Sequence, residues 1–551
     1  MKRTIYTSVS VLALFAAAPV LAQTNVSTIE QSESNNQTTV EQAGVNASSY
    51  VNQSGVATAA NPNKVDVSQK GNGAESFVAQ TGAILNEVEV DQDGNSYSMV
   101  LQDGGRNEAA VSQEGDDNQS FVVQQGISNS TGNAGTSTGI MQIGDDNFSS
   151  VNQAPSNNAK ATVAQTGNAN QSYVDQTLAL TGGDNTTATV AQTGNRNYSY
   201  VDQSAAENDA FVTQTSNDSS STVLQSGANS TATVTQTGND QVSYVNQEDD
   251  AGGISTVSQS GRNNNSIINQ TSNGSQASVT QAAADNVSVL TQGRSAGNAY
   301  QTNGQEALIS QTGRRNQSYA SQSGSSGDLN LSQSGNDNLS IVNQSGFANS
   351  SGDSDVNGEV GISQSGNNND SYVTQSGQLS AAFVDQIGDG NTASISQSVG
   401  NNPNPTGGTD PVVATAEITQ SGNGNYSTVN QFGGSATQSA RLMVAESVQS
   451  GNNNLSTISQ TNNLVDGDSS ANGAFASQSG NYNNSLIVQN GAGNEAVLAQ
   501  AGNYNVSVID QAGSDHVANV AQYSNGNVSG VYQTGVANSA TVVQGSAPVA
   551  N

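Results

Sequence analysis

Side chains able to support catalysis are scarce in this sequence. His516 is the single histidine, and there is no cysteine. A nucleophile activated by a neighbouring base, as in Ser-His-Asp or Cys-His sites, needs such residues beside their partners. We therefore expect no enzymatic activity, no catalytic residues and no cofactor.

Paired carboxylates are the other residues that suggest chemistry. They occur as Asp116-Asp117, Asp145-Asp146 and Asp249-Asp250, each among polar or glycine residues typical of turns. Carboxylate oxygens are ligands for Ca²⁺, but the glycine- and aspartate-rich nonapeptide of calcium β-rolls is absent from the sequence. We interpret the pairs as solvated turn residues and expect no metal site, with weak Ca²⁺ binding between coils as the alternative.

The composition limits the possible partners and folds. Of 551 residues only 33% are hydrophobic, and 44 acidic against 12 basic residues give a formal charge of -32. Nucleic-acid binding needs clustered Lys and Arg, so the charge argues against it. A chain this polar either is disordered or forms a repetitive fold, and the repeat described below favours the second.

The N-terminus has the pattern of a secretory signal peptide, residues 1–22. Lys2 and Arg3 precede an apolar stretch from Val9 to Ala18, and Val20-Leu21-Ala22 forms a small-residue cleavage site. The apolar stretch is too short for a membrane span, and no later segment is apolar enough to be one. We expect residues 23–551 to be one secreted repeat domain without cysteine cross-links.

Glutamine recurs every eleven residues in the centre of the chain. The stretch QTGNRNYSYVDQ runs from Gln192 to Gln203, and the spacing continues through Gln214, Gln225, Gln236 and Gln247. Within each unit Asn, Ser, Val and Gln lie at odd offsets from the first Gln, so they share one face of a strand. Gly follows two residues after Gln, where a turn requires positive φ.

The inward residues are expected to stack on their copies one coil away. A buried amide without partners costs about 1–3 kcal/mol, whereas stacked Gln and Asn amides satisfy one another. The predicted ladder residues are Gln192, Asn197, Ser199, Val201, Gln203, Gln214, Gln225, Gln236, Gln247, Gln489, Asn494, Ala496 and Gln500. The predicted turn residues are Gly194, Gly227, Gly238 and Gly491.

Successive strands alternate in type. The fourth residue before the repeated Gln is Ser before Gln53 and Gln176 but Ala before Gln113 and Gln236. The fold class is therefore all-β, a two-sheet β-solenoid with about 22 residues and two strands per coil. Every insertion follows a Ser-type strand or a strand that takes that place in the order, so the insertions are expected on one edge of the solenoid. The Ser/Ala alternation continues without a break only if GRSAGNAYQ, residues 293–301, is an insertion and not a strand.

An apolar column is expected on the outer face of the Ser-type strands. Its members follow the Ser directly, whereas the Ala-type strands more often have Thr or an acidic residue there. High strand propensity alone explains such residues, but it should act equally on both sheets. The predicted contact ridge comprises Tyr50, Phe77, Phe121, Tyr173, Tyr200, Tyr244, Tyr319 and Tyr372.

The spacing QxGxxNxAxxxQ resembles the curlin repeat of curli fibre subunits. It is seen in QNGAGNEAVLAQ, from Gln489 to Gln500, and with Ser for Ala in QSGNNNDSYVTQ, from Gln364 to Gln375. The resemblance implies stacking roles for Gln192, Asn197, Gln203 and their equivalents. It also implies a secreted bacterial subunit that leaves through an outer-membrane pore and assembles into extracellular amyloid fibres. This chain has many more repeats than a typical curlin subunit.

The repeats run almost from the signal peptide to Asn551, so both ends of the solenoid are expected to be open. Unpaired strand edges invite another chain to pair. The sequence therefore predicts a homopolymer, or a co-polymer with related subunits, at the cell surface or in the biofilm matrix. A monomeric solenoid adhesin or spacer is the main alternative, and an ice-binding solenoid, which needs a regular Thr ladder, is the third.

Overall fold

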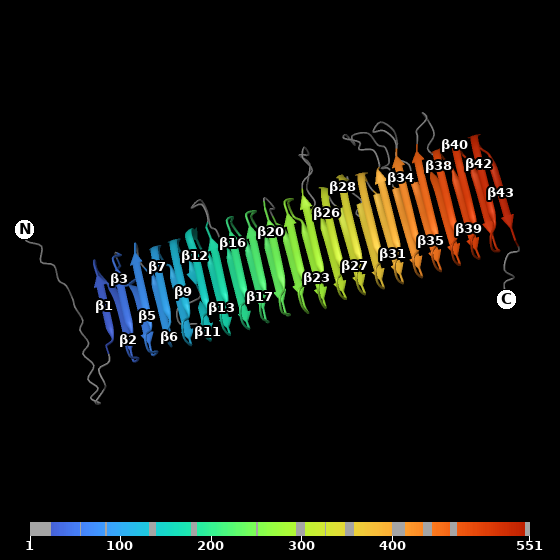
Figure 1. Ribbon diagram of the computed structural model, residues 1–551. Helices are drawn as coiled ribbons and strands as arrows, with labels where there is room; N and C mark the ends of the chain where they lie inside the picture. Colours follow the sequence, from blue (N-terminus) through green and yellow to red (C-terminus); the bar gives the residue numbers. More distant parts are fainter. Residues whose placement is uncertain are drawn as a thin grey trace, which may run out of the picture.

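The computed structural model describes residues 24–55, 57–82, 85–131, 139–177, 185–248, 252–293, 304–325, 327–347, 358–378, 380–398, 414–433, 443–462 and 471–545. These residues form 43 β-strands and no helix. The strands stack into a rod whose first and last strands lie at opposite ends (Figure 1). The expected signal peptide, residues 1–22, lies outside the described residues.

One parallel sheet contains 21 strands, and we call it the serine sheet. In stacking order its strands are β1 (Val26–Gln31), β3 (Ser48–Gln53), β5 (Glu75–Thr81), β7 (Tyr97–Gly105), β9 (Gln119–Ile127), β12 (Phe148–Asn157), β14 (Gln171–Gln176), β16 (Tyr198–Gln203), β18 (Ser220–Gln225), β20 (Val242–Gln247), β22 (Asn265–Gln270), β24 (Val287–Gly293), β26 (Gln317–Ser325), β28 (Leu339–Phe347), β30 (Asp370–Gln378), β32 (Thr392–Ser398), β34 (Tyr426–Gly433), β36 (Leu455–Asn462), β38 (Asn484–Ala492), β40 (Val506–Ser514) and β42 (Val528–Val536).

The second parallel sheet is called the alanine sheet. Its strands are β2 (Asn36–Gln42), β4 (Asn63–Gln69), β6 (Glu87–Asp93), β8 (Glu108–Glu114), β10 (Ser130–Thr131), β11 (Ile140–Ile143), β13 (Lys160–Thr166), β15 (Thr187–Thr193), β17 (Asp209–Gln214), β19 (Thr231–Gln236), β21 (Ile254–Gln259), β23 (Gln276–Ala282), β25 (Glu306–Thr312), β27 (Gly327–Ser334), β29 (Gly358–Ser365), β31 (Ser380–Ile387), β33 (Ala414–Ser421), β35 (Met443–Ser450), β37 (Asn472–Ser479), β39 (Glu495–Ala501), β41 (Val517–Gln522) and β43 (Ser539–Gln544). The short strands β10 and β11 occupy one level, because both pair with β8 and β13.

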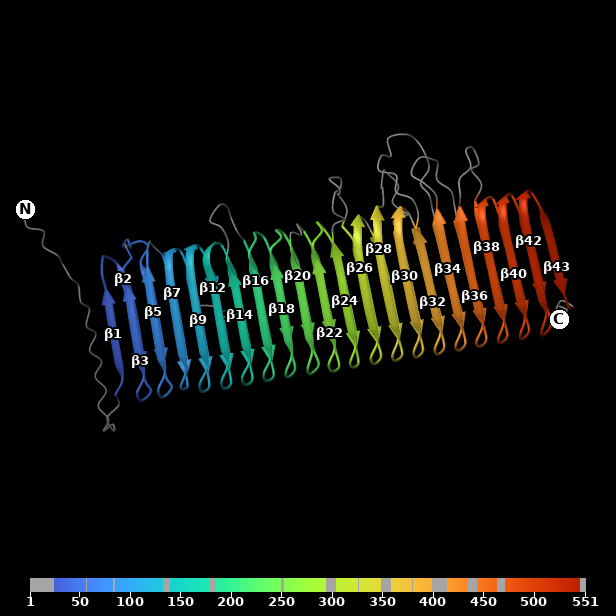
Figure 2. The same cartoon turned by 45° about the horizontal axis from the view of Figure 1, so that its top comes forward.

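Each coil contains one strand of each sheet, with β10 and β11 together forming the alanine-sheet strand of one coil, and the register is set by the repeat. Between β14 and β16, Ser172 lies opposite Ser199 and Gln176 opposite Gln203. Pairing like with like keeps every inward position above its copy, since a slip of one residue would turn the buried face outward. The predicted two-sheet solenoid is confirmed, and Figure 2 shows the strands stacked along the rod.

Small apolar side chains from both sheets fill the interior. Val201 of the serine sheet and Val190 and Ala188 of the alanine sheet are completely buried and belong to one continuous hydrophobic core. Burying a Val side chain contributes about 1.5–3 kcal/mol. Because each coil packs against its two neighbours, the stability of the rod is a sum of local terms between adjacent coils.

The predicted alternation of strands between two sheets is correct, although single strands such as β21, with Ser255, and β32, with Ala393, depart from the residue typical of their sheet. Strands β3 and β14 belong to the serine sheet, and β8 and β19 belong to the alanine sheet. The phase across residues 293–301 is also correct, because β24 pairs with β26 and β23 pairs with β25. Residues 294–303 themselves lie outside the described residues. We call the connections from serine to alanine sheet the insertion edge, and the opposite connections the turn edge.

Candidate functional site: amide ladders, turn edge and aromatic strip

A continuous ladder of glutamine amides runs through the serine sheet from Gln31 to Gln533. In every coil Nε2 of one Gln donates to Oε1 of the Gln in the next coil toward the C-terminus, over 2.6–3.1 Å. The ladder contains four of the predicted residues: Gln203, Gln225, Gln247 and Gln489. All of its bonds therefore have the same direction along the rod.

The alanine sheet contains a second ladder, from Gln42 to Gln544, with the same direction and distances of 2.7–2.9 Å. It contains the other predicted glutamines: Gln192, Gln214, Gln236 and Gln500. Glutamines eleven residues apart in the sequence thus belong to different ladders, and the bonded neighbours are about 22 residues apart.

The second N–H of each ladder amide reaches across the interior. Gln192 Nε2 donates to the backbone carbonyl of Gln171, and Gln203 Nε2 donates to that of Thr187, both over 3.0 Å. The acceptors belong to the opposite sheet. The ladders consequently bond each sheet to itself along the rod and bond the two sheets to each other.

Asparagines at the strand starts use a different pattern from glutamines. Oδ1 of Asn170 accepts the backbone N–H of Asn197 over 3.0 Å, and Oδ1 of Asn197 accepts the backbone N–H of Ser219 over 3.1 Å. Asn494 is bonded in the same way to its neighbours in the coils above and below. The expected amide-to-amide stacking is therefore wrong for Asn197 and Asn494, whereas Asn170 at the same position does donate Nδ2 to Asn147 Oδ1 one coil away, over 3.1 Å.

His516 occupies one of these asparagine positions. It is completely buried, its backbone N–H donates to Asn494 Oδ1, and its Nδ1 accepts the backbone N–H of Asn538 over 3.2 Å. Nδ1 thus replaces the Asn oxygen, which gives the single histidine a structural position.

Serine hydroxyls form an inward column that is incompletely bonded. Ser199 is completely buried, and its Oγ has no hydrogen-bond partner among the described residues. Ser371, in contrast, donates to Ser340 Oγ over 2.9 Å. Burying a hydroxyl without a partner costs free energy, so the two serines should respond differently to removal of the oxygen.

We expect Ser199→Ala to leave stability unchanged or to raise it slightly, because no hydrogen bond is lost. Ser371→Ala should lower stability by about 1 kcal/mol, because Ser340 loses its partner. Hydrogen exchange of the amides in the substituted coil and its two neighbours measures both effects. Equal losses at the two positions would contradict the expectation.

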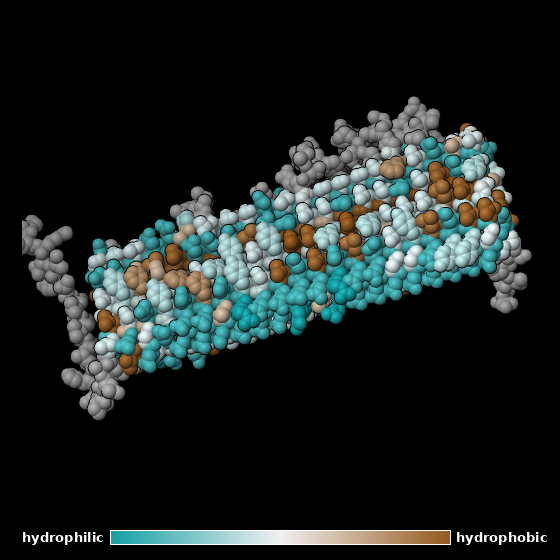
Figure 3. Space-filling view, viewed as in Figure 1, coloured by the Kyte–Doolittle hydropathy of each residue, from teal (hydrophilic) through white to brown (hydrophobic). Residues whose placement is uncertain are grey.

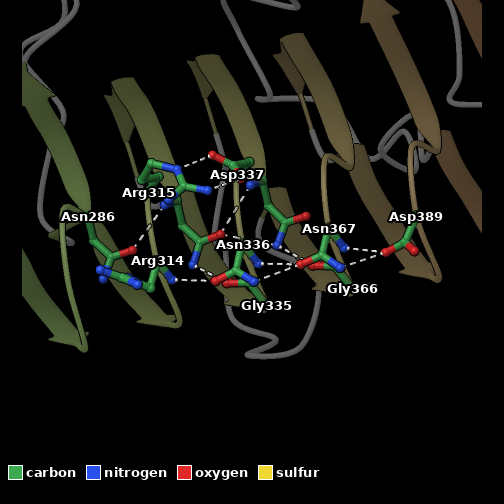
Figure 4. Close-up of polar contacts among 11 residues, drawn as sticks. Asn286, Arg314, Arg315, Gly335, Asn336, Asp337, Gly366, Asn367 and Asp389 are labelled. Carbon is green, nitrogen blue, oxygen red and sulfur yellow. Dashed lines mark hydrogen bonds and ion pairs between the residues drawn. The ribbon is translucent and has the colours of Figure 1, made fainter.

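The turn edge has an exposed ladder of its own, at the residue after the repeat glycine (Figure 4). The backbone N–H of Arg314 donates to Asn336 Oδ1 over 3.1 Å, and that of Asn336 donates to Asn367 Oδ1 over 3.1 Å. The backbone N–H of Asn367 donates to Asp389 Oδ1 over 2.8 Å. The Asn or Asp that follows the glycine therefore joins each turn to the turn of the adjacent coil.

Ion pairs between adjacent coils occur beside this ladder. Arg315 binds Asp337, and Arg196 binds Asp218, each through two hydrogen bonds of 2.6 Å. Arg196 lowers the pKa of the Asp218 carboxyl by hydrogen bonding and by its charge. Exposed ion pairs contribute little to stability. We therefore infer that these two pairs mainly hold the turns of adjacent coils in line with each other.

The predicted turn glycines differ in backbone conformation. Gly194 and Gly491 have positive φ, 113° and 126°. Gly227 and Gly238 do not have positive φ, so that part of the prediction is wrong for them. At Gly238 a Cβ would lie 1.7 Å from the carbonyl oxygen of Gly261, so glycine is required there by the close approach of two backbones.

The residue that has positive φ in nearly every turn is the one before the inward Asn, Ser or Gln. Arg196, Asn229 and Asp240 have φ values of 57°, 60° and 58°. Side chains other than Gly tolerate this region at a cost, with Asn and Asp the most tolerant. Asn and Asp are frequent at this position, and this enrichment is the sequence pattern from which the positive φ could have been predicted.

The acidic pairs contribute to the turn edge. Asp116 Oδ1 accepts the backbone N–H of Asn95, and Asp145 Oδ1 accepts that of Asp116, both over 3.0 Å. Within the described ranges, no group of three or more Asp, Glu or His side chains is arranged to hold a metal ion. Asp249-Asp250 lies outside the described residues.

The predicted contact ridge lies on the outer face of the serine sheet. Tyr50 pairs with Phe77, and Tyr173 pairs with Tyr200, in adjacent strands. Tyr319 and Tyr372 are the most exposed members, at 38% and 36%. Phe121 and Tyr244 occupy the same column and are half-buried by their neighbours.

A second aromatic column, two residues earlier in the strands, was missed. Tyr97, Phe148 and Tyr198 lie there and alternate with the ridge residues Phe121 and Tyr173. Successive ring centroids in the series are 5.1–5.8 Å apart, which is within the range of favourable aromatic contacts. We call these five residues the aromatic strip.

Carboxylates stand in adjacent strands beside the ridge. Burial raises the pKa of Asp202, and the charge of Asp175 in the next strand raises it further, while a hydrogen bond from Tyr200 opposes the shift. A raised pKa means that the folded rod binds this proton more tightly than the unfolded chain does. Stability therefore falls as the pH rises through the pKa of Asp202.

We expect Asp202→Asn to stabilise the rod modestly at neutral pH, because it removes the cost of burying the charge and, in addition, the repulsion from Asp175. The gain should vanish below the pKa of an ordinary aspartate, where both states are protonated. Asp218→Asn is the opposite control, because its pKa is lowered by Arg196 and removal of the charge brings no gain. Thermal unfolding across the pH range measures all three proteins, and a pH-independent gain for Asp202→Asn would contradict the assignment.

Comparison with known proteins identifies one family. Residues 95–126, 183–215, 305–335 and 335–377 match the family model described as Curlin associated repeat. Every matched segment contains strands of both sheets, so the match follows the solenoid coil. No curated protein matches the chain. None of the described residues form a helix able to cross a membrane.

Proposed function

Because this chain is a member of the curlin-repeat family, we propose that it is a structural subunit whose rods assemble end to end into extracellular amyloid fibres. The observation that carries the proposal is the pair of glutamine ladders, which reach the first and last coils with their bonding groups still available.

The two ends of each ladder are chemically complementary. Among the described residues, nothing donates to Oε1 of Gln31 or Gln42 in the first coil. In the last coil, Nε2 of Gln533 and Gln544 each have a bond across the interior but no ladder partner within the part of the chain that the structure describes. The last coil of one copy thus offers donors where the first coil of the next offers acceptors.

The apolar positions of the end coils match in the same way. Ile29 and Val40 are the core residues of the first coil, and Val531 and Val542 those of the last. Ile29 is 46% exposed although its counterparts in the middle of the rod are buried. Stacking of copies would cover this surface and continue both sheets.

This contact joins two different surfaces, so it does not close on itself. Such head-to-tail contacts generate filaments when the rotation between copies does not form a ring. Each added copy lengthens the fibre by one rod, on the order of 100 Å for 21 coils at about 4.8 Å each.

The place of assembly follows from the expected signal peptide and from the family. We infer that residues 1–22 direct export, that residues 23–551 form the repeat domain, and that an outer-membrane pore releases the chain to the cell surface. There the fibres would serve the biofilm matrix, adhesion and cell aggregation. The formal charge of -32 keeps separate chains apart before they reach that site.

A monomeric adhesin or spacer is the competing function, because one rod already spans a long distance. Seeded growth separates the two. Purified mature protein is followed by electron microscopy and fibre diffraction after addition of sheared fibres. Cross-β fibres that elongate from the seeds support the proposal, whereas rods that stay single at micromolar concentration refute it and favour the adhesin.

A further inference from the structure

The outer faces of the two sheets differ in charge. The serine-sheet strands contain seven acidic residues and no Lys or Arg: Glu30, Glu75, Asp103, Asp175, Asp202, Asp370 and Asp510. The alanine-sheet strands contain Lys64 and Lys160 and, among the described side chains, fifteen acidic residues: Glu41, Asp66, Glu87, Glu89, Asp91, Asp93, Glu108, Glu114, Asp209, Glu306, Asp328, Asp385, Glu417, Glu446 and Glu495. Two alanine sheets would therefore repel each other more strongly than two serine sheets.

The faces also differ in apolar content. The contact ridge and the aromatic strip both lie on the serine sheet, where rings contact one another from β7 to β16. On the alanine sheet, aromatic residues at the equivalent outward positions, such as Phe211 and Phe383, are separated by many strands. Figure 3 shows apolar surface gathered in a band along the rod. Such continuous surface usually marks a contact.

The dimensions of the serine sheet suit a flat contact. Strands of six residues are about 20 Å long, and 21 of them at about 4.8 Å give a face of roughly 2,000 Å². A stable interface needs about 800 Å² from each partner. Both faces repeat with the same strand spacing, so the side chains of one can interdigitate with those of the other.

We propose that the occupant of this face is a second copy of the chain, with two rods pairing serine sheet to serine sheet and their alanine sheets facing solvent. The ridge and strip are then covered, and the more acidic faces lie on the outside, where they limit the assembly to two rods. This contact is lateral and independent of the end-to-end contact.

Spin labels test the arrangement, since the chain has no native cysteine. Asn269→Cys in β22 and Thr280→Cys in β23 place a label on the outer face of the middle coil, on the serine and alanine sheets respectively. Copies stacked end to end hold equivalent labels about one rod length apart, on the order of 100 Å. Labels facing each other across paired sheets are separated by a gap of about 10 Å.

We expect dipolar broadening of the electron paramagnetic resonance spectrum at Asn269→Cys and none at Thr280→Cys. Broadening at both positions, at Thr280→Cys alone or at neither overturns the proposal. Elongation rates of the two labelled proteins are measured in parallel. Normal growth without broadening refutes lateral pairing only, and broadening of rods that do not elongate refutes end-to-end assembly only.

A substitution set gives a second readout. Tyr173, Tyr200 and Tyr244 are replaced by Ser together, and the control replaces Phe211, Phe383 and Phe475 of the alanine sheet by Ser. The fibre mass per unit length should fall about twofold in the first variant and stay unchanged in the control. An unchanged mass in the first variant, or an equal fall in both, contradicts the pairing of serine sheets.

Discussion

Fibre elongation is expected to stop when Val531 and Val542 are both replaced by lysine, although the single rod stays folded. Both residues point inward in the last coil, where the next copy would seal them. In the free rod Val531 is 5% exposed and Val542 only partly buried, so a lysine ammonium group has to reach past the open end into water; Val542→Lys alone is the variant to use if the pair does not fold. Between stacked copies the charge would be buried at a cost of several kcal/mol, and each 1.4 kcal/mol is tenfold in affinity.

The concentration needed for growth should therefore rise at least about a hundredfold. The variant retains its first coil, so it should still add to wild-type seeds and then block further growth at that end. Val528→Lys with Val543→Lys is the matched control, because these residues lie in the same strands but are exposed at 68% and 62%. Normal elongation of the inward variant by seeded growth would exclude the proposed end contact.

The substitution Gln203→Leu is expected to disturb three coils. Gln203 is completely buried, accepts a bond from Gln176 and donates to Gln225. Leucine of similar size leaves the Gln176 donor and the Gln225 acceptor without partners. At about 1–3 kcal/mol for each orphaned group, the local loss is about 2–6 kcal/mol.

Hydrogen exchange resolved by strand measures this loss. Protection should fall at least about tenfold in β14, β16 and β18 and be unchanged several coils away. Gln171→Leu in β14 is the control, because that side chain faces outward and lies outside the ladders. A loss confined to β16, or one of equal size in the control, would show that the ladder does not join neighbouring coils.

The sequence was sufficient to predict the sheets and their phase, because the repeat records inward positions directly. The strand that ends at Gln176 has Ser four residues before the Gln, and the strand that ends at Gln236 has Ala there. This one difference was enough to assign each of the two strands to the correct sheet. A slip of one residue would turn the buried side chains outward along the whole strand, so the repeat constrains the register throughout the rod. The family resemblance was likewise confirmed by the matched segments.

The hydrogen bonds of the turn edge were beyond prediction from the sequence. Asn195 and Asn217 were assigned no role, because their bonds join backbone and side chain of different coils and depend on the height of each turn. The positive φ of Arg196 was missed for a related reason. The positive φ was predicted for the repeat glycine, because glycine adopts it most easily. The turn geometry also requires positive φ at the residue before the inward Asn, which is Arg196 in this turn.

Only the part of the aromatic strip that belongs to the contact ridge was predicted from the sequence. Its column at Tyr97, Phe148 and Tyr198 also contains Ser48, Glu75 and Gln119, so composition alone indicated no pattern. The rings are brought together by the stacking of strands that lie more than twenty residues apart. Contacts of this kind depend on which strands are neighbours in space.

The uniform direction of the two glutamine ladders has an electrical consequence. Every side-chain amide in them points its N–H toward the same end, whereas the alternating backbone dipoles of a sheet largely cancel. The rod should consequently possess a permanent dipole moment and orient in an applied field, as transient electric birefringence would detect. In two rods paired side by side, the dipole moments would add if the rods are parallel and would cancel if they are antiparallel.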